Sequence, residues 1–252
     1  MTGKTPELLT FAPMIDSELA RQLLRHYGVA YSEDDHLFGW VSLLTMRNGG
    51  FLQVPMLHGG GVRLDGPREI AEHYDPTMPA DKRLFPPEQP LRTAIDADWE
   101  RYNGSLAGDS AAVSYFYMLP ERSVMVPLFQ RSLKPGEARI VPAVYGALRW
   151  LFKVLLGLEQ AKIDDAVLRI RMAFDATDQR IADGRPFLAG DRLTLGDVAL
   201  ATATAPLLLP AGYIAPVPVY GQMPTALRAI VDELRARPTA SFVSRLYAGW
   251  IG

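Results

Sequence analysis

The sequence contains no cysteine in 252 residues and no excess of either charge sign. The first absence excludes disulfide bonds, thiolate metal sites and a cysteine nucleophile. The second follows from 26 Lys and Arg against 28 Asp and Glu, which leave a net charge of -2. No global field therefore favours nucleic acid or an anionic membrane, and we expect no nucleic-acid partner.

Histidine is scarce, and the N-terminus lacks a long apolar run. The four histidines show no metal-like spacing, so we assign no metal site. Residues 8–11 form an apolar run that is too short for a signal-peptide core or a membrane span. A content of 48% hydrophobic and 21% charged residues is that of a soluble globular protein with one large or two ordinary domains. We expect a cytoplasmic location.

Residues 49–74, with the sequence GGFLQVPMLHGGGVRLDGPREIAEHY, predict a strand, a tight turn, a second strand and a helix. Pro55 interrupts the apolar run 51–57, which is typical of a strand edge, a bulge or a strand start, and we predict a cis Val54–Pro55 bond. The glycines at 59–61 allow the chain to reverse into a strand at 62–64. Pro67 suits the first residue of a helix.

The residues before and after this stretch extend the pattern. A strand at 8–11, an amphipathic helix from Ile15 to Tyr27 and a second strand that can begin at 29–31 precede it, so the order is βαβ and then ββα. Five prolines fall within residues 76–90, which we interpret as an interdomain linker. Everything after the linker has helical spacing.

Two features of the helical part are informative. Residues 140–158 form one apolar stripe opposite Pro142, Gly146, Arg149, Lys153 and Gly157, which excludes a transmembrane span. A helix of the core or of a partner interface is the commoner outcome of such a pattern, and a membrane-surface helix is the alternative. In residues 185–207, Thr194 and Asp197 predict a capping box at the start of a buried helix.

These segments resemble the glutathione S-transferase superfamily, with the resemblance carried by Gln53-Val54-Pro55, the glycines, the 185–207 segment and the C-terminal helix after Arg237-Pro238. The resemblance implies an α/β thioredoxin-like domain at 6–78 followed by an all-α helical bundle at 91–252. It also implies a homodimer, which the amount of amphipathic helix supports. Residues 104–162 fit least well and look longer than is usual for the family.

The resemblance implies that glutathione lies along the first domain and pairs with the backbone of Val54 beside Pro55. Gln53 and Arg47 are candidates to hold the glycyl carboxylate, or they are ordinary solvated side chains. The γ-glutamyl slots hold Gly66 and Pro67.

Gly66 has no side chain, and Pro67 lacks a hydroxyl and an amide hydrogen. Asp65 and Arg68 lie one residue to either side and are the candidate substitutes. A solvent-exposed helix cap is the alternative interpretation of these two residues.

The position usual for thiol activation holds Met14, whose thioether cannot donate a hydrogen bond. Ser17 and Thr10 are the nearest hydroxyls and our candidate catalytic residues, although an N-cap and an ordinary strand residue are their alternative roles. The helix-start amides could also stabilise a thiolate, with Asp16 opposing them by like-charge repulsion.

The candidate wall of the second-substrate site consists of Met14, Tyr115, Tyr117 and Trp150. The resemblance thus implies a glutathione transferase that uses the glutathione thiolate on a small apolar electrophile. The alternative is a non-catalytic relative that binds an apolar ligand or a protein partner in the interdomain cleft.

Overall fold

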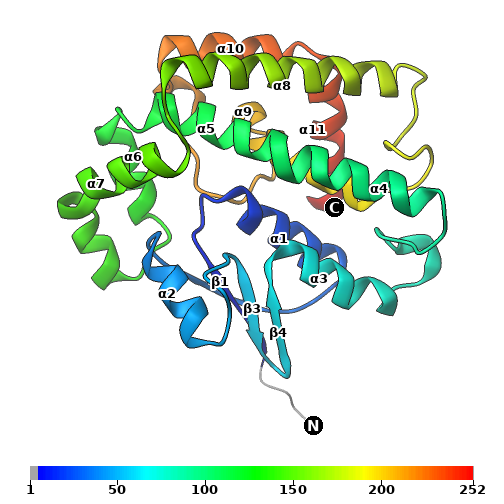
Figure 1. The fold of residues 1–252 in the computed structure, drawn as a ribbon, viewed down its shortest axis with the longest axis horizontal. Helices are drawn as coiled ribbons and strands as arrows, with labels where there is room; N and C mark the ends of the chain where they lie inside the picture. The colour runs from blue at the N-terminus through cyan, green and yellow to red at the C-terminus, as the bar shows by residue number, and fades with distance from the viewer. Residues whose placement is uncertain (1–4, 252) are drawn as a thin grey trace.

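A four-stranded mixed sheet forms the N-terminal part of the molecule (Figure 1). The computed structural model describes residues 5–251. The central strand β1 (Glu7–Thr10) pairs in parallel with β2 (Ser32–Asp35) and antiparallel with β3 (Met56–Gly59). β3 forms a hairpin with β4 (Val62–Asp65), so the strand order is β2-β1-β3-β4. This is the predicted thioredoxin-like arrangement.

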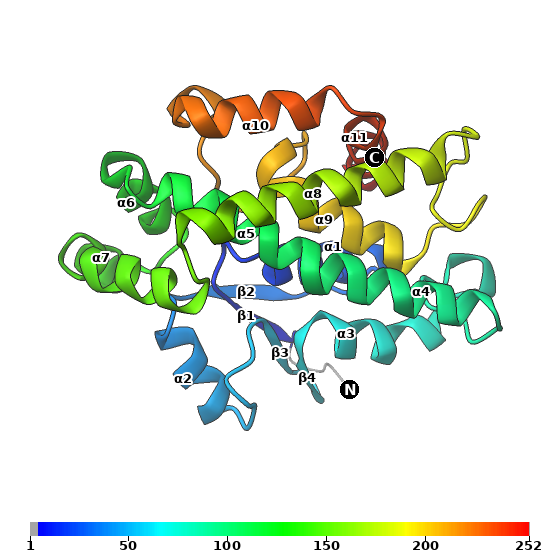
Figure 2. The same ribbon diagram turned by 45° about the horizontal axis from the view of Figure 1, so that its top comes forward.

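Three helices accompany the sheet. α1 (Ile15–His26) and α3 (Gly66–Tyr74) pack against each other on the side that faces the helical part. α1 buries a stripe that includes Leu19 and Leu23, both fully buried. α2 (Trp40–Arg47) lies on the other side of the sheet (Figure 2). These two helices, α1 and α3, therefore lie between this face of the sheet and the second domain (Figure 2).

Residues 49–74 have the predicted order of elements with shifted boundaries. The Val54–Pro55 bond is cis, and the turn glycines 59–61 all have positive φ, as predicted. The strand expected at 51–57 begins only at Met56, because Leu52 adopts φ +63° and interrupts an extended backbone.

The remaining helices form the C-terminal part: α4 (Leu91–Trp99), a π-helical segment (Glu100–Leu106), α5 (Ala107–Met118), α6 (Arg122–Gln130), α7 (Pro135–Leu155), α8 (Gln160–Ile181), α9 (Leu195–Leu208), α10 (Thr225–Arg235) and α11 (Pro238–Ile251). Short 3₁₀ turns occupy Asp75–Thr77, Ala80–Lys82 and Tyr220–Gln222. Among residues 5–251, no single helix is long and apolar enough to cross a membrane, while α7 and α8 pass that test only as a pair bent by 63°.

α9 is the central helix, and α1, α5 and α11 surround it (Figure 1). The predicted capping box at its start is present. The backbone amide of Thr194 donates to Asp197 Oδ2 at 2.8 Å, and the amide of Leu188 donates to Asp197 Oδ1 at 2.7 Å. Burial raises the pKa of Asp197 to about 6, while these donors oppose the rise. The box fixes the start of the core helix.

A cluster of polar contacts joins β2 to the start of α7. His36 Nδ1 lies 2.6 Å from Glu137 Oε1, and His36 Nε2 lies 3.0 Å from Asp34 Oδ2. The other Glu137 oxygen accepts from the amide of Leu37 at 2.8 Å, and Lys134 pairs with Asp34 at 2.5 Å. These contacts hold the first turn of α7 against the sheet edge. The domain boundaries at 78 and 91 stay predictions.

Candidate functional site

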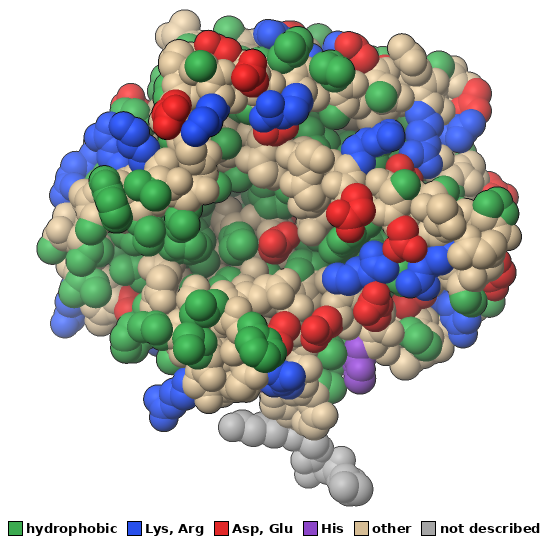
Figure 3. Space-filling model, viewed as in Figure 1, with side chains coloured by type: hydrophobic (Ala, Val, Ile, Leu, Met, Phe, Trp, Pro, Cys, Tyr) green, Lys and Arg blue, Asp and Glu red, His purple; other side chains and the backbone are tan. Residues whose placement is uncertain are grey.

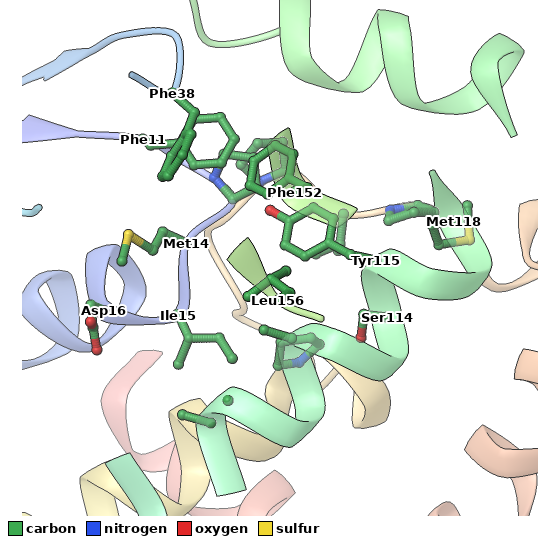
Figure 4. Close-up of a pocket in the computed structure, with 18 of the residues that line it drawn as sticks. Phe11, Met14, Ile15, Asp16, Phe38, Ser114, Tyr115, Met118, Phe152 and Leu156 are labelled. Atoms are coloured by element: carbon green, nitrogen blue, oxygen red, sulfur yellow. The ribbon is translucent and has the colours of Figure 1, made fainter. Parts of the chain in front are cut away.

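A cavity of about 380 Å³ lies between the two parts of the chain. Its walls come from the β1–α1 loop, the segment before α2, the face of α5, the end of α7 and the loop after α9 (Figure 4). Most of the lining is apolar, and the cavity appears as a hollow bordered by hydrophobic side chains (Figure 3). A cavity of this size and lining suits a small apolar molecule.

Four aromatic rings form one side of the cavity. Phe152 stacks on Tyr115, with ring centroids 4.8 Å apart and planes at 13°, and it lies 4.9 Å from Phe38. Phe11 stacks on Phe152 from the sheet side at 5.9 Å. Flat rings in such arrangements favour a planar or aromatic guest. Phe152 thus joins the two domains and shapes the cavity between them.

The start of α1 forms the opposite rim. Met14 is the N-cap and lines the cavity, followed by Ile15 and Asp16 (Figure 4). The Met14 side chain gives α1 no cap hydrogen bond, so the amides of the first turn have no side-chain acceptor from the cap. Burial raises the pKa of Asp16 to about 6, and a hydrogen bond with Asn103 opposes this rise.

The candidate hydroxyls Ser17 and Thr10 point into the protein. Both residues are fully buried. Ser17 Oγ donates to the carbonyl of Phe11 at 3.0 Å, and Thr10 Oγ1 donates to Glu33 Oε1 at 2.8 Å. Neither residue lines the cavity. Their hydrogen-bonding protons are thus used in joining α1 and β1 to their neighbours.

Four of the predicted glutathione contacts, Gln53, Val54, Pro55 and Gly66, lie together near the end of β4. Val54 and Pro55 are buried, and the carbonyl of Pro55 accepts from the amide of Gly66 at 2.9 Å. Gln53 is exposed, and its side chain covers Gly66 so closely that a Cβ there would lie 2.5 Å from Gln53 Nε2. Arg47 is exposed at the end of α2. The glycine at 66 therefore makes room for Gln53.

Asp65 is the polar group of this region that lacks a full set of partners. Its side chain is 8% exposed, and no hydrogen bond among residues 5–251 reaches its Oδ1 atom. The other oxygen lies 3.3 Å from Arg63 Nη1. A buried carboxylate oxygen without a donor matches the ammonium of a γ-glutamyl group, so this part of the site fits glutathione. Pro67 beside it is buried and offers no amide donor.

Arg68 is engaged elsewhere. Its guanidinium donates to Asp96 at 2.8 Å and to Glu72 at 2.7 Å, and it lies 4.1 Å above the ring centre of Phe85. The structure therefore uses Arg68 to connect α3 to α4. Asp65 is the better placed of the two candidate substitutes.

The predicted substrate wall is divided by the structure. Met14 and Tyr115 line the main cavity, and Tyr117 lines a neighbouring cavity of about 320 Å³. Trp150 lies outside both and is 66% exposed on α7. The cavity is also lined by residues that were not predicted from the sequence: Phe11, Phe38, Asn103, Phe152 and Tyr213. For Phe152, the apolar stripe of residues 140–158 was the available signal.

Asp16 predicts a pH-dependent stability. Its folded-state pKa of about 6 lies above the ordinary value of 3.8. Its contribution to stability is therefore full below that ordinary value and is lost as the pH rises through the folded value. Because Asp16 is only partly buried, we expect Asp16→Asn to stabilise the protein by about 1–2 kcal/mol near pH 8 and to have little effect near pH 4.

Denaturant unfolding of the parent and of Asp16→Asn across this pH range measures the difference directly. Asp197 titrates in both proteins and cancels in the comparison. An equal difference in stability at both ends of the range would contradict the assignment of this pKa to Asp16.

The sequence and the fold of this chain are similar to those of known proteins. Residues 160–220 match the family model of the glutathione S-transferase C-terminal domain. The glutathione S-transferase of Sinorhizobium meliloti 1021 is 19% identical, covers 95% of this chain and 92% of its own, and has a TM-score of 0.54. The β-etherase LigF of Sphingobium sp. strain SYK-6 is 16% identical, covers 96% of this chain and 100% of its own, and has a TM-score of 0.58.

A glutathione S-transferase of Ceriporiopsis subvermispora, solved in complex with glutathione, is 13% identical, covers 98% of both chains and has a TM-score of 0.59. No curated protein matches the chain in sequence. The fold is that of the glutathione S-transferases, with a thioredoxin-like first domain and a helical second domain. With the match at 160–220, the resemblance to this superfamily that was predicted from the sequence is confirmed.

Proposed function

We propose that this chain is a glutathione-dependent transferase with atypical residues at the thiol-activating and γ-glutamyl positions, which holds a planar apolar acceptor in the interdomain cavity. The observation that carries the proposal is the meeting of two features, the aromatic cavity and the start of α1 without a side-chain cap. Glutathione, when bound, supplies the sulfur nucleophile. The residues of the chain orient both reactants and stabilise negative charge.

The start of α1 is the candidate site for that charge. The first-turn amides and the helix dipole favour an anion at this end. Met14 contributes apolar contact and no donor, and the hydroxyls of Ser17 and Thr10 are turned inward. Thiolate stabilisation therefore falls to backbone amides, against the repulsion of an ionised Asp16.

The first domain provides the candidate contacts to the peptide. Val54 offers its backbone, Gln53 lies on the adjacent surface, and Asp65 Oδ1 offers the acceptor for an ammonium. Pro67 leaves the γ-glutamyl carboxylate without one amide donor. We infer weak binding of glutathione, because a charged ligand loses affinity when one of its hydrogen bonds is absent.

A second candidate function is the binding of an apolar ligand without chemistry. The inward hydroxyls of Ser17 and Thr10 favour it, since neither reaches the cavity. In that case the aromatic wall of Phe38, Tyr115 and Phe152 is the functional part of the site, and the first domain serves as its frame.

Two measurements separate the candidates. Retention on immobilised glutathione and conjugation of an activated aryl halide are expected for the transferase, and Asp16→Asn should conjugate faster than the parent near pH 8, because it removes a charge that repels the thiolate. Binding of pyrene to the cavity, followed by fluorescence, is expected for both candidates. Pyrene binding without retention and without conjugation would favour the second candidate over the first.

A further inference from the structure

The molecule exposes an apolar surface beside the mouth of the cavity. It is formed by α2 and α7, and its members are Trp40, Leu43, Met46, Trp150, Val154 and Leu155. Each of these side chains is more than half exposed, and the two tryptophans reach 52% and 66%. Figure 3 shows hydrophobic side chains gathered over α7 and α2 and continuing into the hollow.

The surface is continuous with the cavity. Leu155 is exposed and also lines the cavity. Phe38, two residues before the start of α2, contacts Phe152 of α7 with ring centroids 4.9 Å apart. The contacts of Glu137 with His36 and Leu37 hold the start of α7 at the same edge. The two helices therefore present one surface rather than two separate patches.

The charged side chains that α2 and α7 themselves carry are positive apart from Glu137, while Glu121 lies beside Arg149 and Lys153 in the neighbouring cavity. Arg47 belongs to α2, and Arg139, Arg149 and Lys153 belong to α7. All four are exposed, and none takes part in an ion pair among residues 5–251. α2 contains no acidic residue, and the acidic residue of α7, Glu137, is engaged with His36. Although the net charge of the chain is -2, these four side chains form a local group of positive charges, the basic margin.

We propose that the α2–α7 surface docks on an anionic lipid bilayer, with the apolar side chains in the interfacial layer and the basic margin among the headgroups. Exposed tryptophans flanked by Arg and Lys are the composition of interfacial helices. A second copy of the chain is a poorer occupant, because a symmetric pairing would bring the two basic margins together. The cavity then opens toward the lipid. The consequence that an apolar acceptor enters from the bilayer rests on the proposed function, whereas docking itself does not.

Flotation with lipid vesicles tests the proposal on the full chain. The protein should bind vesicles of phosphatidylcholine that contain phosphatidylserine, and it should bind vesicles of phosphatidylcholine alone much more weakly. Each basic side chain near an anionic surface contributes roughly fivefold to binding, so Arg149→Gln with Lys153→Gln should weaken it by at least about tenfold. Trp150→Ala should weaken binding to the same vesicles.

Matched variants control for charge and for exposed apolar area. Arg25→Gln with Lys82→Gln changes the net charge equally but lies outside α2 and α7, and Met172→Ala removes an exposed apolar side chain of α8. Both should bind as the parent does. The proposal is overturned if the protein binds neither vesicle, or if the control variants weaken binding as much as the test variants. Light scattering that shows a dimer dissociated by Trp150→Ala would also overturn it, because a second copy then covers the surface.

Discussion

Phe152→Ala should lower the free energy of unfolding by about 3–5 kcal/mol, the range for removing a buried phenylalanine ring. Phe152 is 4% exposed and its ring meets those of Phe11, Phe38, Phe129 and Tyr115. Two of these partners belong to the first domain, so the loss affects both cores at their contact. Urea unfolding followed by circular dichroism measures the change.

The same helix provides the control. Trp150 lies two positions earlier and is 66% exposed, so Trp150→Ala should change stability by no more than about 0.5 kcal/mol. Phe152→Leu should recover part of the loss, since it refills some of the volume without the ring contacts. A Phe152→Ala variant as stable as Trp150→Ala would show that the aromatic cluster does not hold the two domains together.

The parts of the fold that were predictable depend on strong local signals. The cis Val54–Pro55 bond, the turn glycines at 59–61 and the box of Thr194 with Asp197 each involve residues close together in the chain. A fixed proline φ, a glycine at positive φ and a reciprocal cap restrict the backbone wherever the segment is placed. Such signals survive folding unchanged.

Two elements of the first domain escaped the same reasoning. The second strand, expected to begin at 29–31, starts only at Ser32. β2 (Ser32–Asp35) consists of four polar residues whose pairing with β1 overrides their low strand propensity. α2 was not predicted, since its apolar residues include exposed Trp40, Leu43 and Met46 and form no single buried stripe. Both elements depend on tertiary contacts, which the local sequence does not show.

The candidate site shows the same division. Asp65, Gly66 and Pro67 follow one another, so the local sequence was enough to propose them, and their role in binding stays a prediction. Met14 could likewise be placed at the start of the first helix from the sequence. The cavity wall combines Phe11, Phe38, Tyr115 and Phe152. The first and the last of these are separated by more than a hundred residues in the sequence. The sequence likewise could not predict that the hydroxyls of Ser17 and Thr10 point inward, because the direction of a side chain depends on its tertiary partners.

Pro67→Ser should tighten glutathione binding by about tenfold or more. The substitution restores an amide donor and a hydroxyl at the start of α3, beside the Asp65 oxygen that accepts no hydrogen bond within residues 5–251. Hydrogen bonds to charged groups contribute about 1.5–3 kcal/mol, and about 1.4 kcal/mol corresponds to tenfold in affinity. The expected cost is about 0.4–1 kcal/mol of stability from the lost proline restriction. Replacing Gly66 as well would add strain, because it adopts φ +87° beneath Gln53.

Calorimetric titration of glutathione into a series of variants separates the contributions. Pro67→Ala restores only the amide, so its affinity should lie between those of the parent and of Pro67→Ser. Asp65→Asn in the Pro67→Ser background should remove much of the gain, since the ammonium loses its charged acceptor. If Pro67→Ser, Pro67→Ala and the parent bind glutathione equally while all remain folded, the start of α3 does not contact the γ-glutamyl group. The assignment of Asp65, Gly66 and Pro67 to that contact would then have to be abandoned.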